Sequence, residues 1–341
     1  MILMMANSSK DISKFNPRRF FALGGISVVL CALLAPGSFM APFAILTPLP
    51  LIISSLLYGR AKTFGLILIS GGVLGLLSVE LIRDISPLGY FLFSAIIAIA
   101  LSEFIHREIA PIRGIVVTGI AALIFFATVF LYVDMTSEAG IKQLIIKEVI
   151  PSFNMEERLE EIKASGRTDT LQFEALLSKP DLMAEEIIKT IPTLLSVAVF
   201  LTLWINMFFA LRLRRVLTPF SQGKRYTEKV LTNFKMPDQF VWLVIVLLTT
   251  YLGAEYEVTG LLSGSVGTVA QTGLFVLGIF YFFHGFGIYL YFLDAMKIYG
   301  FFRSFLVVTT VFMLSWGVAV IGLIDTFVDF KNLLNKKNQG E

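Results

Sequence analysis

Residues 114–133 read GIVVTGIAALIFFATVFLYV, a run of twenty residues without a charged side chain. A helix needs about 20 residues to cross the roughly 30 Å hydrocarbon core of a bilayer, so this run predicts a membrane span. The sequence as a whole predicts an all-α, polytopic transmembrane bundle of about nine spans. The other eight apolar stretches are residues 20–35, 42–57, 64–79, 88–101, 191–211, 240–253, 269–293 and 304–324.

The composition supports a membrane protein and excludes several other classes. Hydrophobic residues make up 56% of the chain and charged residues 16%, whereas a soluble domain carries about 25% charged residues. The apolar runs are continuous rather than alternating, which excludes a β-barrel. A net charge of +3 gives no reason to expect a nucleic-acid partner, and one cysteine allows no intramolecular disulfide. We expect no metal and no cofactor.

The chain also lacks the short motifs that mark common enzymes. We find no His-Glu-x-x-His, no P-loop and no dinucleotide-binding glycine pattern. We therefore expect no catalytic residues and no enzymatic activity.

Positive charge predicts the orientation in the membrane, because lysine and arginine gather on the cytoplasmic side. An N-terminus in the cytoplasm places the basic second, fourth, sixth and eighth connections inside. Nine spans would then leave the basic tail outside, so either one stretch does not span or the charge bias is weak here. The first stretch also resembles a secretory signal, although no small-x-small cleavage site follows. The residues behind the orientation are Arg60, Lys62, His106, Arg107, Arg113, Arg212, Arg214, Arg215, Lys224, Arg225, Lys229, Lys235, Lys297 and Arg303, against Lys331, Lys336 and Lys337 in the tail.

The spans divide the chain into four expected parts. Residues 1–133 form a five-span block, and residues 134–190 form an extracytoplasmic helical insert that includes an amphipathic piece at 141–150. Residues 191–238 hold the sixth span and a basic cytoplasmic segment, and residues 239–341 hold three spans and the tail. The basic segment, from Arg212 to Lys235, either lies on anionic lipid headgroups or is only a positive stop signal.

A few polar and helix-breaking residues inside the spans are candidates for ligand binding. Pro48 and Pro50 remove two backbone donors in the second span, and broken membrane helices occur where the backbone is buried in protein or lines a cavity. Asn206 in the sixth span and His284 in the eighth are polar groups that should face protein or water. Each has a structural alternative: a packed kink for the prolines, and a hydrogen bond to a neighbouring helix for Asn206 and His284.

Glycine spacing predicts close helix packing at two places. The Gly71-x3-Gly75 pair in the third span is a small-x3-small motif, which lets helices approach closely. Gly278 and Gly285 in the eighth span are seven residues apart and so lie on one stripe.

The end of the last span resembles a known family. Residues 321–331 read IGLIDTFVDFK, which is similar to the closing string of the YybS-like predicted membrane proteins, the bacterial family of domain of unknown function 2232. Lys331 stands where arginine is usual. The Pro-Leu-Pro-Leu of residues 48–51 and the start of span seven at residues 234–238 also fit, and His284-Gly285 falls where the family tends to carry Gln-Gly. Within the string, Asp325 and Asp329 lie one turn apart, where we expect both to stay hydrated and, with Lys331, to form a helix terminus or a partner contact.

The resemblance implies a bacterial inner-membrane protein of a family without an established activity. The first six spans look similar to the substrate-binding components of energy-coupling-factor transporters, although the enlarged insert and the three added spans depart from that pattern. Two functions follow as expectations. The first is a transport component that binds a small molecule among spans two, three and six. The second is a non-enzymatic scaffold or assembly partner that acts through the 212–235 segment and the 325–331 terminus.

Overall fold

The protein is helical throughout the part of the chain that can be described. The computed structural model describes residues 16–32, 45–82, 84–136, 140–150, 179–217, 229–256 and 265–330, and these ranges contain no strand. They fall into two compact units, which are described separately. Unit 1 comprises Met1–Gly119, Ala198–Val241 and Gly278–Glu341, and unit 2 comprises Ile120–Val197 and Trp242–Leu277.

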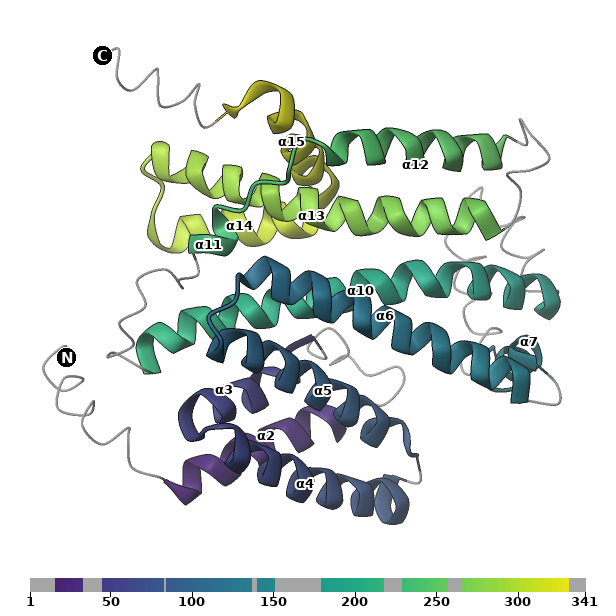
Figure 1. Ribbon diagram of the computed structural model, residues 1–341, viewed down its shortest axis with the longest axis vertical. Helices are drawn as coiled ribbons and strands as arrows, with labels where there is room; N and C mark the ends of the chain where they lie inside the picture. Colours follow the sequence, from purple (N-terminus) through teal and green to yellow (C-terminus); the bar gives the residue numbers. More distant parts are fainter. Residues whose placement is uncertain are drawn as a thin grey trace, which may run out of the picture. The chain divides into compact units, whose positions relative to one another are not determined.

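Four helices make the N-terminal part of unit 1 (Figure 1). They are α2 (Pro17–Ala32), α3 (Leu49–Tyr58), α4 (Arg60–Leu77), which continues into a π-helical turn η2 (Ser78–Ile82), and α5 (Ser86–His106). Each of the four contacts the other three. The predicted small pair on α4 packs against α5, because Gly71 faces the Phe91 ring and Gly75 faces Leu88. Small residues at these positions allow the two helices to approach.

The remaining helices of unit 1 are α11 (Lys229–Thr232), α14 (Gly300–Met313) and α15 (Ser315–Val328), with parts of α6 (Pro111–Thr136), α10 (Pro180–Leu217) and α13 (Ser265–Ala295). Aromatic packing joins α10 to α13. The ring of Trp204 stacks on Phe283 with centroids 4.1 Å apart, and Phe280 and Phe234 meet it edge-on. Such pairs contribute about 0.5–1.5 kcal/mol beyond their buried area.

Unit 2 contains the rest of α6, α10 and α13 together with α7 (Gly140–Leu144), a π-helical turn η3 (Ile145–Val149) and α12 (Phe240–Glu255). The amphipathic piece predicted at 141–150 is confirmed, since Ile141, Ile145 and Ile150 bury their side chains with Ala184 in one apolar cluster. α12 and α13 run side by side (Figure 1), and Gly273 of α13 faces Leu247 of α12.

Nine separate spans are not confirmed, although the transmembrane character is. Five described helices are long and apolar enough to cross a bilayer: Arg60–Glu80, Ser86–His106, Pro111–Thr136, Asp181–Leu213 and Val266–Ala295. A sixth is added if α14 and α15, which bend by 91° at Leu314, act as one broken span. Within the second predicted span the described helix α3 has ten residues and begins directly after Pro48, and α12 has sixteen.

Large apolar side chains remain exposed along the described helices. Leu68 on α4, Ile124 on α6 and Trp242 on α12 are each more than half exposed. Surfaces of this kind suit contact with lipid, where exposed apolar side chains cost nothing.

Candidate functional site

The proline break before α3 is buried inside unit 1. Its backbone carbonyls are held by side chains from other helices. Asn206 of α10 donates from Nδ2 to the carbonyl oxygen of Ile45 at 2.6 Å, and also to that of Thr202 in its own helix at 2.7 Å. Ser27 of α2 reaches the Thr47 carbonyl at 3.5 Å, and the Thr47 hydroxyl bonds Ser94 of α5 at 2.8 Å. The irregular backbone is therefore satisfied by protein, as a bilayer requires.

The side-chain oxygen of Asn206 is a hydrogen-bond acceptor that these contacts leave unexplained. The side chain is 0% exposed, and no described residue donates to its Oδ1 atom. A buried carbonyl without a donor costs free energy, which is why such atoms call for an explanation.

His284 of α13 and Asp325 of α15 form a buried pair in unit 1. The His284 Nε2 and Asp325 Oδ2 atoms are 3.0 Å apart, and the two residues are 1% and 2% exposed. The other carboxylate oxygen of Asp325 accepts from the backbone N–H of Phe330 at 2.7 Å. One carboxylate thus joins two helices and also holds the chain where α15 ends.

The end of α15 has a second ion pair, which is more exposed. Asp329 lies just after the helix in the left-handed region, with φ of 49°, and its N–H donates to the Asp325 carbonyl. Its carboxylate lies 3.8 Å from the Lys235 ammonium group, which precedes α12. The expectation that both aspartates stay hydrated is therefore wrong for Asp325, which is buried against a histidine of α13, whereas the Asp329 side chain is 43% exposed.

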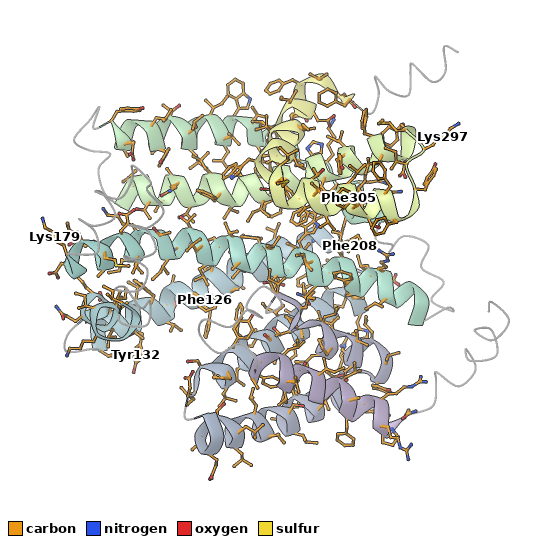
Figure 2. All side chains as sticks on the ribbon, turned by 180° about the vertical axis from the view of Figure 1, so that it is seen from behind. Phe126, Tyr132, Lys179, Phe208, Lys297 and Phe305 are labelled. Atoms are coloured by element: carbon orange, nitrogen blue, oxygen red, sulfur yellow. The ribbon has the colours of Figure 1, made fainter. Side chains whose placement is uncertain are left out.

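A large apolar pocket lies in unit 2, between α6, α7, η3 and α10. Its volume is about 790 Å³, within the range of about 300–1,000 Å³ typical of small-molecule sites. Figure 2 labels one of its lining residues, Phe126, on the same helix as Tyr132. Among the described residues of the lining, Ser196 is the only polar one, and its hydroxyl donates to the Pro192 carbonyl. The lining is Leu123, Phe126, Ala127, Val129, Phe130, Leu131, Val133, Ile141, Leu144, Ile145, Ile188, Ile191, Pro192, Leu195 and Ser196.

A kink-prone residue and an ion-pair cluster border this pocket. Pro192 lies inside α10 and has no N–H to bond the carbonyl of Ile188, one turn earlier. At the same end, Lys142 of α7 lies 2.7 Å from Glu185 and 3.7 Å from Asp181 of α10. The hydrogen bond to Glu185 raises the pKa of the Lys142 ammonium group. The pocket thus has an apolar interior and charged groups at the end where α7 meets α10.

The comparisons with known proteins identify a family. The family model described as predicted membrane protein (DUF2232) matches residues 25–326. The chain belongs to this family. No curated protein and no solved structure matches the chain.

The structure brings together some of the residues singled out in this DUF2232 protein. Asn206 lies beside the proline break of the second stretch, where Pro48 directly precedes α3 and Pro50 lies in the first turn of that helix. His284 meets Asp325, and Asp329 meets Lys235. Lys331 lies outside the described residues, as does much of the 212–235 segment. Ligand binding at Pro48, Pro50, Asn206 and His284 stays a prediction, as do the block boundaries and the similarity to energy-coupling-factor components.

Two features were not predicted from the sequence. The pocket of unit 2 depends on the insert helices packing against α6 and α10, which spacing within one segment does not indicate. The His284–Asp325 pair joins residues 41 positions apart. The sequence does carry a signal for this pair, because a histidine inside one membrane stretch and an aspartate at the end of another each need a partner when buried.

Proposed function

We propose that this DUF2232 protein is a transport component that binds a small apolar or amphiphilic molecule in the pocket of unit 2. The proposal rests mainly on the size and lining of the pocket. A volume of about 790 Å³ with a single hydroxyl among its described lining side chains suits a molecule that is largely hydrocarbon. The role is non-enzymatic: the molecule is bound and passed on without a change in its bonds.

The position of the pocket along α6 and α10 supports the proposal that the bound molecule enters from the extracytoplasmic side of the membrane. Its residues lie in the second half of α6 and the first half of α10, next to the insert. We place the N-terminus in the cytoplasm of a bacterial inner membrane, because basic residues gather in alternate connections. In that orientation the pocket opens toward the extracytoplasmic half of the bilayer. This site differs from the one expected among spans two, three and six.

The test fills the pocket and measures what the protein carries. Ala127 lines the pocket and is exposed, so Ala127→Trp occupies the space without disturbing a buried core. Ala121→Trp is the matched control, because Ala121 is exposed on the same helix and outside the pocket lining. The variants are purified in mild detergent, and co-purifying small molecules are identified by mass spectrometry.

The proposal expects an apolar or amphiphilic molecule that is retained by the wild type and by Ala121→Trp and is lost from Ala127→Trp. Equal retention by all three proteins, or no retained molecule beyond bulk lipid, would refute it. A retained molecule is then tested for passage across proteoliposomes, which separates a transport component from a protein that only stores its ligand.

A scaffold or assembly partner is the second candidate, and one contact favours it. The Lys235–Asp329 ion pair joins the two segments that were expected to contact a partner. Lys235→Gln should then reduce the proteins captured from native membranes, whereas Lys179→Gln, which removes an exposed lysine elsewhere, should not. Unchanged capture by Lys235→Gln would leave the scaffold role without support.

A further inference from the structure

A polar cavity lies at one end of the N-terminal helices of unit 1, away from the residues discussed so far. Its volume is about 490 Å³, and it opens where α3 ends, α4 begins and α5 ends. The lining combines charged, hydroxyl and apolar side chains: Ser55, Arg60, Ala61, Thr63, Phe64, Ile99, Ser102 and Glu103. This mixture contrasts with the nearly all-carbon lining of the pocket in unit 2.

Two charged side chains, Arg60 and Glu103, line the cavity, and a third, Arg107, binds one of them. One oxygen of Glu103 lies 3.0 Å from the Arg60 Nε atom in an ion pair, and the other oxygen binds Arg107. Two guanidinium groups and one carboxylate leave one positive charge. The Arg60 side chain is 58% exposed and its guanidinium group carries five N–H donors, so it is well suited to bind a phosphate while the ion pair with Glu103 keeps it at the cavity. Glu103 therefore acts as a positioning residue for Arg60.

Polarity changes in the same direction along both helices that line the cavity. Arg60 begins α4, and Phe64 follows it by one turn; Glu103 lies near the end of α5, and Ile99 precedes it by one turn. One turn of α-helix is about 5.4 Å, so each helix is charged at its end and apolar one turn deeper. Phe64 and Ile99 are 56% and 46% exposed, which makes their apolar surface available to a hydrocarbon chain.

Three of the residues that line the cavity carry hydroxyl groups and are buried. Ser55, Thr63 and Ser102 are each less than 5% exposed. Ser55 bonds the His106 ring at 3.2 Å, Thr63 donates to the Gly59 carbonyl, and Ser102 donates to the Ile99 carbonyl. Since these groups are oriented by protein partners, the cavity wall is held in place before any ligand arrives.

From the charge, the polarity gradient and the volume we propose that this cavity binds the phosphate group of an anionic glycerophospholipid, with Arg60 as the phosphate contact and Phe64 and Ile99 against an acyl chain. A small inorganic anion would contact only the charged end of the cavity. A phospholipid would contact that end with its phosphate group and the apolar part with an acyl chain. Basic sites between helices at a membrane surface are suited to anionic headgroups. This site is independent of the pocket in unit 2 and of the basic 212–235 segment.

The test measures lipid retention by native mass spectrometry. The wild type is released from nanodiscs that contain equal amounts of phosphatidylglycerol and phosphatidylcholine with the same acyl chains. We expect one phosphatidylglycerol to be retained in preference to phosphatidylcholine. Arg60→Gln should lower that preference by about tenfold, the effect of losing a charge-assisted contact. The control Arg113→Gln removes an exposed arginine from the start of α6, which follows the same end of α5, and should retain the preference.

A cavity-filling variant and three contradicting outcomes complete the test. Ala61→Phe fills the cavity at an exposed position without changing its charge, and it should also reduce retention even if Arg60→Gln fails to fold. An equal loss in Arg60→Gln and Arg113→Gln would show attraction by bulk charge and overturn the proposal. Binding of inorganic phosphate at Arg60 without any retained lipid would overturn the lipid assignment. Absence of a preference for phosphatidylglycerol in the wild type would overturn it as well.

Discussion

Gly285 of α13 and Gly322 of α15 lie at a crossing where the two helix backbones touch. A Cβ atom on Gly285 would overlap the Val318 carbonyl oxygen, and one on Gly322 would overlap the Tyr281 carbonyl oxygen. His284 precedes Gly285, and Asp325 follows Gly322 by three residues, so the same crossing carries the buried pair. The absence of side chains at two positions allows the polar groups beside them to meet.

Gly285→Ala should separate α13 from α15. The added methyl group would meet backbone, which cannot move aside as a side chain can, and overpacking costs about 1–3 kcal/mol. The unfolding midpoint in detergent, followed by tryptophan fluorescence, should fall. Gly278→Ala is the control on the same predicted stripe, since a Cβ atom there meets open space. Equal midpoints for the two variants would contradict the crossing.

Asp325→Ala should destabilise the protein by about 1–3 kcal/mol, because the buried His284 ring and the Phe330 N–H both lose their acceptor. Asp329→Ala removes a more exposed carboxylate and should cost less. Denaturant unfolding measures both variants.

The His284→Gln variant tests whether the buried pair needs only a hydrogen bond to Asp325 or needs the imidazole ring itself. Glutamine also has an N–H to offer Asp325, and the family resemblance places glutamine at this position, so stability should be close to that of the wild type. A loss as large as that of Asp325→Ala would show that the imidazole itself is required.

Asn206→Leu should destabilise unit 1, because it leaves the Ile45 carbonyl buried without its donor. The expected cost is about 1–3 kcal/mol. Thr250→Val, which removes an exposed hydroxyl bonded within its own helix, is the control. If Asn206→Leu instead keeps full stability and loses a co-purifying molecule, ligand binding rather than support of the proline break is its role.

Acid should weaken the start of α5 through Asp84. Hydrogen bonds from the Ser86 backbone N–H and hydroxyl lower the pKa of the Asp84 carboxyl group. A lowered folded-state pKa means that the stabilisation is complete above the ordinary value and is lost as pH falls through the folded-state value. Asp84→Asn should therefore reduce the acid-side slope of the unfolding midpoint. Glu255→Gln, at an exposed position, should leave it unchanged.

Much of the helical content could be predicted from residue type alone. Each of the nine apolar stretches overlaps a described helix, because the bilayer requires long runs without charge. The break at Leu314 was missed because no proline marks it; only Ser315 and Gly317, weak helix formers, stand nearby. Pro192 is the opposite case, since a proline usually breaks a helix, yet α10 continues through it from Pro180 to Leu217.

The partners of polar residues could not be predicted. Helical periodicity shows on which face of its own helix each of His284 and Asp325 lies. It does not show which faces of the two helices pack against each other. Glu103 and His106 lie three residues apart, a spacing that places them on one face of a helix, but the structure directs Glu103 to Arg60 and Arg107, and His106 to Ser55. No group of three metal-ligand side chains occurs within the described ranges.

Photo-cross-linking inside the pocket of unit 2 tests the proposed function most directly. A benzophenone side chain at Leu195, which lines the pocket, is illuminated in native membranes, with Ala121 as the control position. A transport component should yield a small-molecule adduct at position 195 and not at 121, identified by its mass on the digested peptide. A protein adduct at 195, or only bulk lipid at both positions, would contradict the account.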